Sequence, residues 1–488
     1  MVGPVWNLVI FLMFRKPSPR KISTRRPGWA AACLFLFALI GCVAARPDVA
    51  GDAGRALGLE NAIVFRTRVE AIDVGPSGGA DLSPQQALRL ALEHDPRIQA
   101  ALAKVRVAEA DANQARLLPN PILNVDFRFP QPGQSNRVFE ATLTGDLVGL
   151  LQKPGQIGAA DKRLRESASD ALSTVLDVAS EVQIAYSTAR SIDAEMENAR
   201  GRLKILEQLR DMAQKRLDAG DATRLDVLTL EAQRMQATLD LSDLQLQLVE
   251  QRLTLARLLG QPRSAADWKL SPWEAPADTA LASEAAWIDA ALANRPELRS
   301  RMWELKALGD DLAVASLSPL MGGDVGAHGE RDPEWRVGPT ITTPVPIFDF
   351  GQAAREKVKA ERVVARQELL EAQREAIEDV RLAYATCVQS TQALGDAQDR
   401  LLPLQEQQRN QAKLAYESGD ADLTTLLLAE TDFQLTTSKI AALREKVTVA
   451  RVRLQRAAGG AGVADKIHDA ATMPAAVPTS QPAAGVTK

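Results

Sequence analysis

Apolar residues recur at two different periods along the chain, and the two periods alternate in a fixed order. In the longest segments apolar positions lie three and four residues apart, which predicts long helices that pack through one apolar stripe. One stripe contains Val175, Val178, Val182, Ala185, Ala189, Ile192, Met196, Ala199, Leu203 and Leu206. In two short segments apolar and polar residues alternate, which is typical of strands with one apolar and one polar face.

The alternating segments predict two β-hairpins, over about residues 122–148 and 321–343. In the first, the apolar positions are Leu123, Val125, Phe127 and Phe129, then Phe139, Ala141 and Leu143 after a turn-rich stretch. In the second they are Val325 and Ala327, then Trp335, Val337 and Ile341 after a predicted turn at 329–333. Glycines at 322, 323, 326 and 329 weaken the first strand of the second hairpin.

Helices are predicted around these hairpins. Ser83-Pro84 can cap a first helix, Pro96 interrupts it, and a second helix runs from Ile98 to Arg116. Two much longer runs, Gln156–Leu217 and Gln352–Tyr416, each end in a Gly-Asp-Ala turn. Returning helices follow at Leu225–Leu259 and Leu423–Ala457, and Pro403 predicts a kink or break in the second long run.

The whole pattern occurs twice, with an offset of roughly 200 residues, which marks an internal duplication. Ala91-Leu92 returns as Ala291-Leu292, Gly155-Gln156 as Gly351-Gln352, and Gly220-Asp221-Ala222 as Gly419-Asp420-Ala421. Two copies of long helical hairpins favour a tube over an active-site cleft. We divide the chain into a signal peptide (1–41), a lipidated and irregular amino-terminal arm (42–81), a first repeat (82–262), a linker (263–283), a second repeat (284–460) and a disordered tail (461–488).

Composition narrows the function classes. The chain is 46% hydrophobic but only 4% aromatic, and its net charge of −4 does not indicate nucleic-acid binding. Cys387 stands alone in a helical pattern and is expected to be a small buried residue. His94, His328 and His468 lack ligand spacing, and we find no phosphate loop or Ser/His/Asp set, so the sequence predicts no catalytic residue, cofactor or metal site.

The amino-terminal leader reads as an export signal, with a basic region before an apolar run, Trp29–Ile40, that is short for a membrane anchor. Leu39-Ile40-Gly41-Cys42 resembles a bacterial lipobox, which predicts lipidation of Cys42; the alternative is an ordinary signal peptide cleaved near Ala44-Ala45. Val43 after the cysteine favours the outer membrane. A second apolar stretch, Val2–Phe14, indicates that translation begins at Met13.

Strands with one apolar and one polar face suit an outer-membrane barrel. Four strands cannot close alone, because small barrels start at about eight strands, and a trimer with a twelve-stranded barrel is the simplest closure. The predicted lipid-facing residues are Leu123, Val125, Phe127, Phe129, Phe139, Leu143, Trp335, Val337 and Ile341. The competing interpretation is a lipid-anchored periplasmic coiled-coil adaptor or scaffold without a pore, and an enzyme is disfavoured.

This arrangement resembles the TolC family of outer-membrane efflux channels, from Leu82 to Gly460. The motifs that carry the resemblance are Leu117-Leu118-Pro119-Asn120-Pro121, Pro344-Val345-Pro346-Ile347-Phe348-Asp349-Phe350-Gly351 and the two Gly-Asp-Ala turns. It implies a mainly α fold with a small β part, in which duplicated helical hairpins form a periplasmic α-barrel below a trimeric β-barrel in outer-membrane lipid. It also implies a homotrimer that docks onto a periplasmic adaptor and an RND-type inner-membrane pump, and conducts drugs or heavy-metal ions.

The family closes its tunnel at the periplasmic tip, which corresponds here to Gly220–Glu231 and Gly419–Glu430. Candidate residues for this periplasmic gate are Asp221, Arg224, Asp226, Asp420 and Asp422, because rings of carboxylates in a narrow throat attract cations. The alternative is that they only form turns and cap helices. The chain departs from the best-known family pattern, since Thr425 and Leu428 stand where two carboxylates are expected.

Overall fold

The computed structural model describes residues 44–59, 63–66, 81–129, 138–271, 281–332 and 334–472. The predicted signal peptide, Cys42, and the tail after residue 472 lie outside these residues. In chain order the elements are α3 (Val49–Leu57), β1 (Asp81–Leu82), α4 (Pro84–His94), α5 (Pro96–Arg116), β2 (Ile122–Arg128), β3 (Val138–Asp146), α6 (Leu147–Ala219), α7 (Arg224–Leu258), β4 (Lys269–Leu270), α8 (Glu284–Asn294), α9 (Pro296–Ser316), the short 3-10 helix η1 (Ser318–Leu320), β5 (Asp324–Asp332), β6 (Glu334–Thr342), α10 (Gln352–Asp396), the π-helical turn η2 (Ala397–Leu401), α11 (Leu402–Ser418), α12 (Leu423–Ala458) and α13 (Ala461–Thr472).

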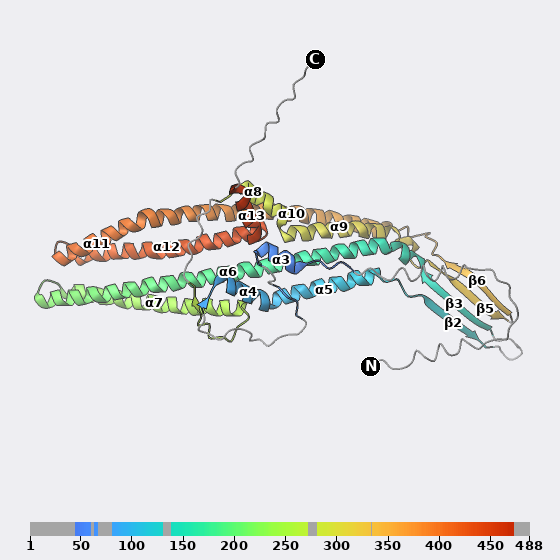
Figure 1. Cartoon of the computed structure of the whole chain (residues 1–488), viewed down its shortest axis with the longest axis horizontal. Helices are drawn as coiled ribbons and strands as arrows, with labels where there is room; N and C mark the ends of the chain where they lie inside the picture. The colour runs from blue at the N-terminus through green and yellow to red at the C-terminus, as the bar shows by residue number, and fades with distance from the viewer. Residues whose placement is uncertain are drawn as a thin grey trace, which may run out of the picture. The chain divides into compact units, whose positions relative to one another are not determined.

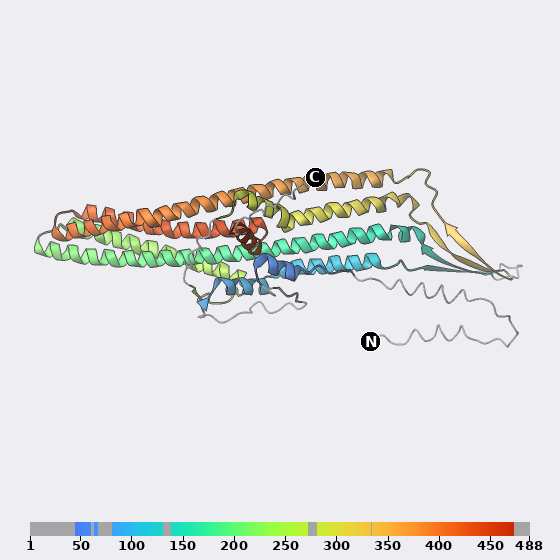
Figure 2. The same cartoon turned by 45° about the horizontal axis from the view of Figure 1, so that its top comes forward.

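The two repeats have the same order of elements. In the first, α4 and α5 lead into the hairpin β2–β3 and then into the helical hairpin α6–α7; in the second, α8 and α9 lead into β5–β6 and the hairpin made by α10, η2, α11 and α12. Figure 1 shows both helical hairpins extending to one end of residues 44–472, with the strands at the opposite end. The turned view in Figure 2 shows the same separation.

The residues predicted to start and end the helices do so in the structure. Ser83 forms a capping box with Gln86 at the start of α4, and Asp95 caps α5, with Pro96 in its first turn. Gly220 and Gly419 end α6 and α11 with φ of 89° and 84°, a backbone conformation that glycine adopts without strain. The two tips therefore close by the same local rule.

Helix packing is continuous along the predicted stripe of α6. Val175, Val178, Val182, Ala189 and Met196 are buried, as the three-and-four spacing predicted. They belong to clusters that α6 shares with α4, α5 and the end of α7, while a second cluster around Trp287, Val380 and Leu454 holds the second repeat together. Cys387 is fully buried on α10, and burial raises the pKa of its thiol.

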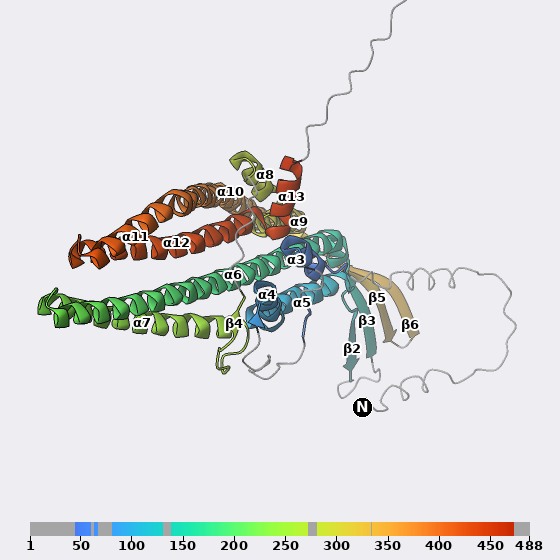
Figure 3. The same cartoon turned by 60° about the vertical axis from the view of Figure 1, so that its left-hand side comes forward.

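Three segments for which no helix or strand was predicted contain regular structure. In the amino-terminal arm, Asp48 caps α3 and Gly58 ends it. In the linker, Lys269–Leu270 pairs in parallel with Asp81–Leu82, and Trp268 is buried beside them. In the tail, Ala461–Thr472 forms α13, which packs against α3, α8 and α12 (Figure 3). Weak local signals misled these predictions, because the segments are ordered by surfaces of distant helices.

The boundaries of the second hairpin and of the long helices also needed correction. The predicted turn at 329–333 is wrong, because β5 continues to Asp332 and β6 begins at Glu334. The first long helix begins at Leu147, before Pro154, because Asp146 accepts the backbone N–H of Gly149 and caps it. At Pro403, where a kink or break was predicted, the helical backbone continues, but the π-helical turn η2 precedes the proline, which lacks an N–H and crowds the carbonyl four residues earlier.

Candidate functional site

The two β-hairpins form one antiparallel sheet in the order β2-β3-β5-β6. Its register pairs Phe127 with Phe139 and Leu123 with Leu143, and then Leu143 with Ala327 and Val337 with Gly329. Because pairs match odd with odd numbers and side chains alternate, all odd-numbered strand residues lie on one face. That face is apolar apart from Arg331, and the other face is mostly polar.

Eight of the nine residues predicted to face lipid are largely exposed: Leu123, Val125, Phe127, Phe129, Leu143, Trp335, Val337 and Ile341. The ninth, Phe139, is half-buried because its ring lies between those of Phe127 and Trp335, at centroid distances of 5.0 and 5.8 Å. Phe129 lies one residue beyond the end of β2. The exposed aromatic and aliphatic side chains form a single patch that one chain leaves uncovered.

The opposite face carries a polar network. Arg128 donates to Glu140 at 2.8 Å, and the imidazole Nε2 of His328 lies 3.5 Å from the same carboxylate. The hydroxyl of Thr142 lies 2.9 Å from Nδ1 of His328. A close approach explains one of the glycines that weakened the strand prediction, because a Cβ on Gly326 would lie 2.0 Å from the carbonyl oxygen of Leu143.

At the tip of the first repeat, a capping box begins α7. The backbone N–H of Asp226 donates to the Thr223 hydroxyl at 3.2 Å, and the backbone N–H of Thr223 donates to the Asp226 carboxylate at 2.8 Å. Asp221 and Arg224 are exposed, and no hydrogen bond or ion pair engages their side chains within the described residues. Of the three predicted residues here, one is therefore a structural cap and two are free at the surface.

At the second tip, Asp422 caps α12. Its carboxylate accepts the backbone N–H of Thr425 at 2.9 Å and the Thr425 hydroxyl at 2.6 Å. These hydrogen bonds, the hydroxyl first, hold the pKa of the Asp422 carboxyl below its usual value, so it stays charged. Asp420 is exposed and accepts the Ser418 hydroxyl at 2.8 Å. The residue that replaces an expected carboxylate, Thr425, thus supports the carboxylate of Asp422.

A contact between the two tips was not predicted from the sequence. The guanidinium of Arg216 in α6 lies over the ring of Tyr416 in α11, 4.8 Å from its centroid, and donates to the Tyr416 carbonyl at 3.1 Å. It also donates to the Asp221 carbonyl at 3.4 Å. The available signal in the sequence was their similar placement, since Arg216 lies four residues before Gly220 and Tyr416 lies three residues before Gly419. This contact ties the first hairpin to the second.

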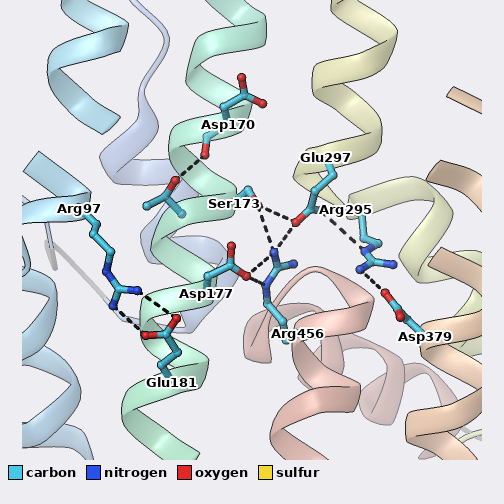
Figure 4. A network of polar contacts seen from close by, with 10 residues as sticks. Arg97, Asp170, Ser173, Asp177, Glu181, Arg295, Glu297, Asp379 and Arg456 are labelled. Carbon is cyan, nitrogen blue, oxygen red and sulfur yellow. Dashed lines mark hydrogen bonds and ion pairs between the residues drawn. The ribbon is translucent and has the colours of Figure 1, made fainter. Parts of the chain in front are cut away.

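A second unpredicted set of contacts joins the repeats farther from the tips (Figure 4). Arg456, near the end of α12, donates to Asp177 at 2.7 Å and to Ser173 at 3.1 Å on α6, and pairs with Glu297 on α9. Burial opposes the charge of Glu297, but Arg456 and Ser173 outweigh it and lower the pKa of that carboxyl. Nearby, Arg295 donates to Asp379 at 2.8 Å. This network fixes α12 against elements of both repeats.

None of the helices in the described part of the chain has the length and apolar character needed to cross a bilayer. Nor do His, Cys, Asp and Glu side chains gather there in a group that could hold a metal ion.

Comparisons with known proteins show which family the two repeats match. A sequence model described as outer membrane efflux protein matches residues 87–261 and 287–460. The pyoverdine export outer membrane protein OpmQ of Pseudomonas aeruginosa is 28% identical over 480 residues, which cover 89% of this chain and 97% of that protein. Two solved structures have the same fold. The structure of the outer membrane protein VceC of Vibrio cholerae is 17% identical in sequence and superposes with a TM-score of 0.64; the match covers 77% of this chain and 96% of that one. The Neisseria gonorrhoeae MtrE outer membrane channel in its open state is 18% identical with a TM-score of 0.59, covering 81% and 95%.

Proposed function

Because the chain belongs to the outer membrane efflux protein family, we propose that three copies join their sheets into one twelve-stranded barrel above a helical tunnel. The protein is the outer-membrane channel component of an efflux system, and most of its chain lies in the periplasm. Its role is passive conduction, and we assign it no catalytic residue, cofactor or metal site.

The observation that carries the trimer proposal is the four-stranded sheet. It has an apolar odd-numbered face and a mostly polar even-numbered face, and β2 and β6 each have a strand on one side only among the described residues. An open edge facing lipid would leave backbone N–H and C=O groups without partners, which costs several kcal/mol for each group. Pairing β6 of one copy with β2 of the next removes both edges.

We infer the partners from the tips. The helical hairpins end in short, exposed, charged turns, which suit docking onto a periplasmic adaptor and, through it, an RND-type inner-membrane pump. The cargo we propose is drugs or heavy-metal ions. The name of the relative OpmQ states that it exports pyoverdine, so pyoverdine-type compounds are a third class to test. Loss of the gene should raise the susceptibility of cells to the cargo, and a set of drugs, metal salts and pyoverdine-type compounds distinguishes the classes.

The trimer is tested by fractionation. The full chain should be found in the outer membrane and run in SDS as a trimer that dissociates on boiling. The Cys42→Ser variant should lose the lipid that mass spectrometry detects on the mature amino terminus, yet remain trimeric in the membrane. Recovery of this variant as a soluble periplasmic monomer would instead support the adaptor or scaffold without a pore.

The gate proposal concerns Asp221, Arg224, Asp226, Asp420 and Asp422 around the threefold axis. Because Asp226 completes the capping box of α7 and Asp422 caps α12, alanine would remove each charge together with these hydrogen bonds. Asparagine keeps capping ability while removing the charge. We expect Asp226→Asn with Asp422→Asn to lower the cation selectivity and raise the conductance of single channels in planar bilayers. Exposed Asp218→Asn, outside both caps, is the matched control. Unchanged currents in the double variant would exclude both carboxylates from the gate.

A further inference from the structure

Two irregular linkers at the base of the sheet carry apolar side chains that the described chain does not cover. Leu117 and Leu118 lie between α5 and β2, and Ile122 is the first residue of β2; their exposed fractions are 55%, 48% and 58%. The linker from β6 to α10 presents Val345, Ile347, Phe348 and Phe350, and Phe348 is 90% exposed. Such a concentration of exposed apolar side chains marks an interaction surface.

The β6–α10 linker is held in place by its own chain, and the helix before the α5–β2 linker is tied to α6. In the β6–α10 linker, Asp349 accepts the backbone N–H of Gly351 at 2.7 Å, and Gln352 accepts that of Phe350 at 2.8 Å. Gly351 has a φ of +73°, and a Cβ there would lie 2.9 Å from Pro319. Before the α5–β2 linker, Arg116 donates to both carboxylate oxygens of Asp161 at 2.7 Å. The exposed side chains are therefore presented in a defined place.

The topology brings these linkers together only between different copies. β2 and β6 are the outer strands of one antiparallel sheet, three strand spacings apart, which is roughly 14 Å at about 4.8 Å for each spacing. They run in opposite directions, so the start of β2 and the end of β6 lie at the same end of the sheet. When β6 pairs antiparallel with β2 of a second copy, the end of β6 meets the start of that β2.

We propose that the segment Val345–Phe350 of one copy packs against the segment Leu117–Ile122 of a second copy, forming an apolar contact at the base of the barrel. The inference rests on the proposed trimer and names a surface that holds it together beyond the strand pairing.

The backbone of the β6–α10 linker favours a protein occupant over lipid. Among the described residues, no hydrogen bond engages the backbone N–H groups of Val345, Ile347, Phe348 or Asp349. Irregular backbone with free polar groups does not occur against hydrocarbon, but it is tolerated where protein or water meets it. Apolar side chains on such a backbone fit a second copy, whose Asn120 and linker carbonyls can also supply acceptors.

The experiment is disulfide cross-linking of the full chain in outer membranes. Leu117→Cys, Leu118→Cys and Ile122→Cys are each combined with Phe348→Cys and oxidised. We expect at least one pair to convert monomer into covalent dimer and trimer on denaturing, non-reducing gels, since a disulfide needs Cα atoms less than about 7 Å apart. Each single-cysteine variant controls for the native cysteines. Phe129→Cys with Phe348→Cys is the negative control, because Phe129 follows the far end of β2.

The outcomes separate this proposal from the trimer. If the unmodified chain forms an SDS-resistant trimer but none of the three pairs gives covalent dimer, the linker contact is wrong and the trimer stands. If the protein is monomeric in the membrane, both fail.

A second measurement does not depend on choosing the right pair. Phe348→Ser should lower the temperature at which the SDS-resistant trimer dissociates, whereas Phe129→Ser, which alters an aromatic ring exposed to 79%, should leave it within error. Equal shifts in the two variants, or none in Phe348→Ser, would overturn the proposal and leave lipid as the occupant.

Discussion

The two long helical runs derive from one duplicated pattern, yet they differ in continuity. The first is a single helix of 73 residues, α6, which includes Pro154 without an interruption. The second is divided into α10 of 45 residues, a π-helical turn of 5 and α11 of 17, with the π-helical turn just before Pro403. Pro154 follows only about two turns of helix, whereas Pro403 has long helix on both sides. The difference shows that a proline's effect depends on how much helix must stay in register around it.

The two runs also differ in burial. α6 buries a nearly continuous stripe against α5, α7, α9 and α12. By contrast, α10 buries few large side chains and exposes Val363, Val364, Leu370 and Leu382 by 43–68%. α6 is therefore packed largely within its own chain, whereas α10 leaves apolar side chains exposed, as does α7 of the first repeat at Leu225, Leu239 and Leu246.

The largest effect is expected when a proline is introduced into α6 at the position that corresponds to Pro403. Lys204 lies sixteen residues before Gly220, as Pro403 does before Gly419. Lys204→Pro should destabilise the protein by about 3 kcal/mol, because proline removes a helical hydrogen bond and α6 has no π-helical turn there to accommodate the loss. Lys204→Ala is the matched control at this exposed position. The measurement is chemical unfolding in detergent followed by circular dichroism; equal stabilities of the two variants would contradict the explanation.

A somewhat smaller effect is expected where the repeats are joined. Arg456→Ala should cost about 2 kcal/mol, because it removes the nearer of the two cations beside the partly buried Glu297 and leaves only Arg295, at 3.7 Å. The estimate is below the range for fully buried pairs, since the side chain of Glu297 is 35% exposed. Arg453→Ala, an exposed arginine one turn earlier on α12, should change stability little in the same unfolding experiment. A loss of equal size there would show that the network contributes nothing specific.

The tips offer a subtler contrast, because a threonine caps α7 and an aspartate caps α12. Thr223→Ala and Asp422→Ala should each cost about 1 kcal/mol, while Asp422→Ser, which can still cap, should retain most of the stability. Hydrogen exchange of the first-turn amides measures each cap locally. Faster exchange at Thr425 in Asp422→Ser than in Asp422→Ala would refute the assignment.

The smallest expected effect is a pH dependence. Burial, then Glu304 and Asp170, raise the pKa of Glu166 to about 7. Between pH 4.5 and 7 the carboxyl of Glu166 is therefore protonated in the folded protein but ionised in the unfolded chain. As the pH rises through this window, the contribution of Glu166 to the free energy of unfolding falls. Glu166→Gln should flatten the fall in melting temperature between pH 5 and 8, and Glu375→Gln, an exposed carboxylate, should not. A profile unchanged by Glu166→Gln would remove this group as its source.

Local patterns in the sequence were sufficient for most of the fold. The period-two segments predicted both hairpins, and the odd-numbered residues named from Leu123 to Ile341 do share one face, because a strand's alternation needs no tertiary information. The three-and-four spacing predicted the buried stripe of α6 for the same reason. The signals failed where order comes from distant surfaces, as in α3, β4 and α13.

The gate residues named from the sequence stay a prediction, and the sequence did not show which side chains they contact. Asp226 and Asp422 could be read equally as charges in a throat or as caps, and only the coordinates of Thr223 and Thr425 show the capping bonds. Arg216 and Tyr416, 200 residues apart, meet only because two hairpins lie side by side.

The sequence by itself determined the duplication, the two periods and the turns, since each depends on residues a few positions apart. The tertiary structure decided that α6 is buried along a stripe while α10 is not, where Arg456 joins both repeats, and which two linkers lie at the base of the open sheet edges. Those contacts arise between segments separated by hundreds of residues, and their partners are chosen by packing and desolvation, which no local pattern encodes.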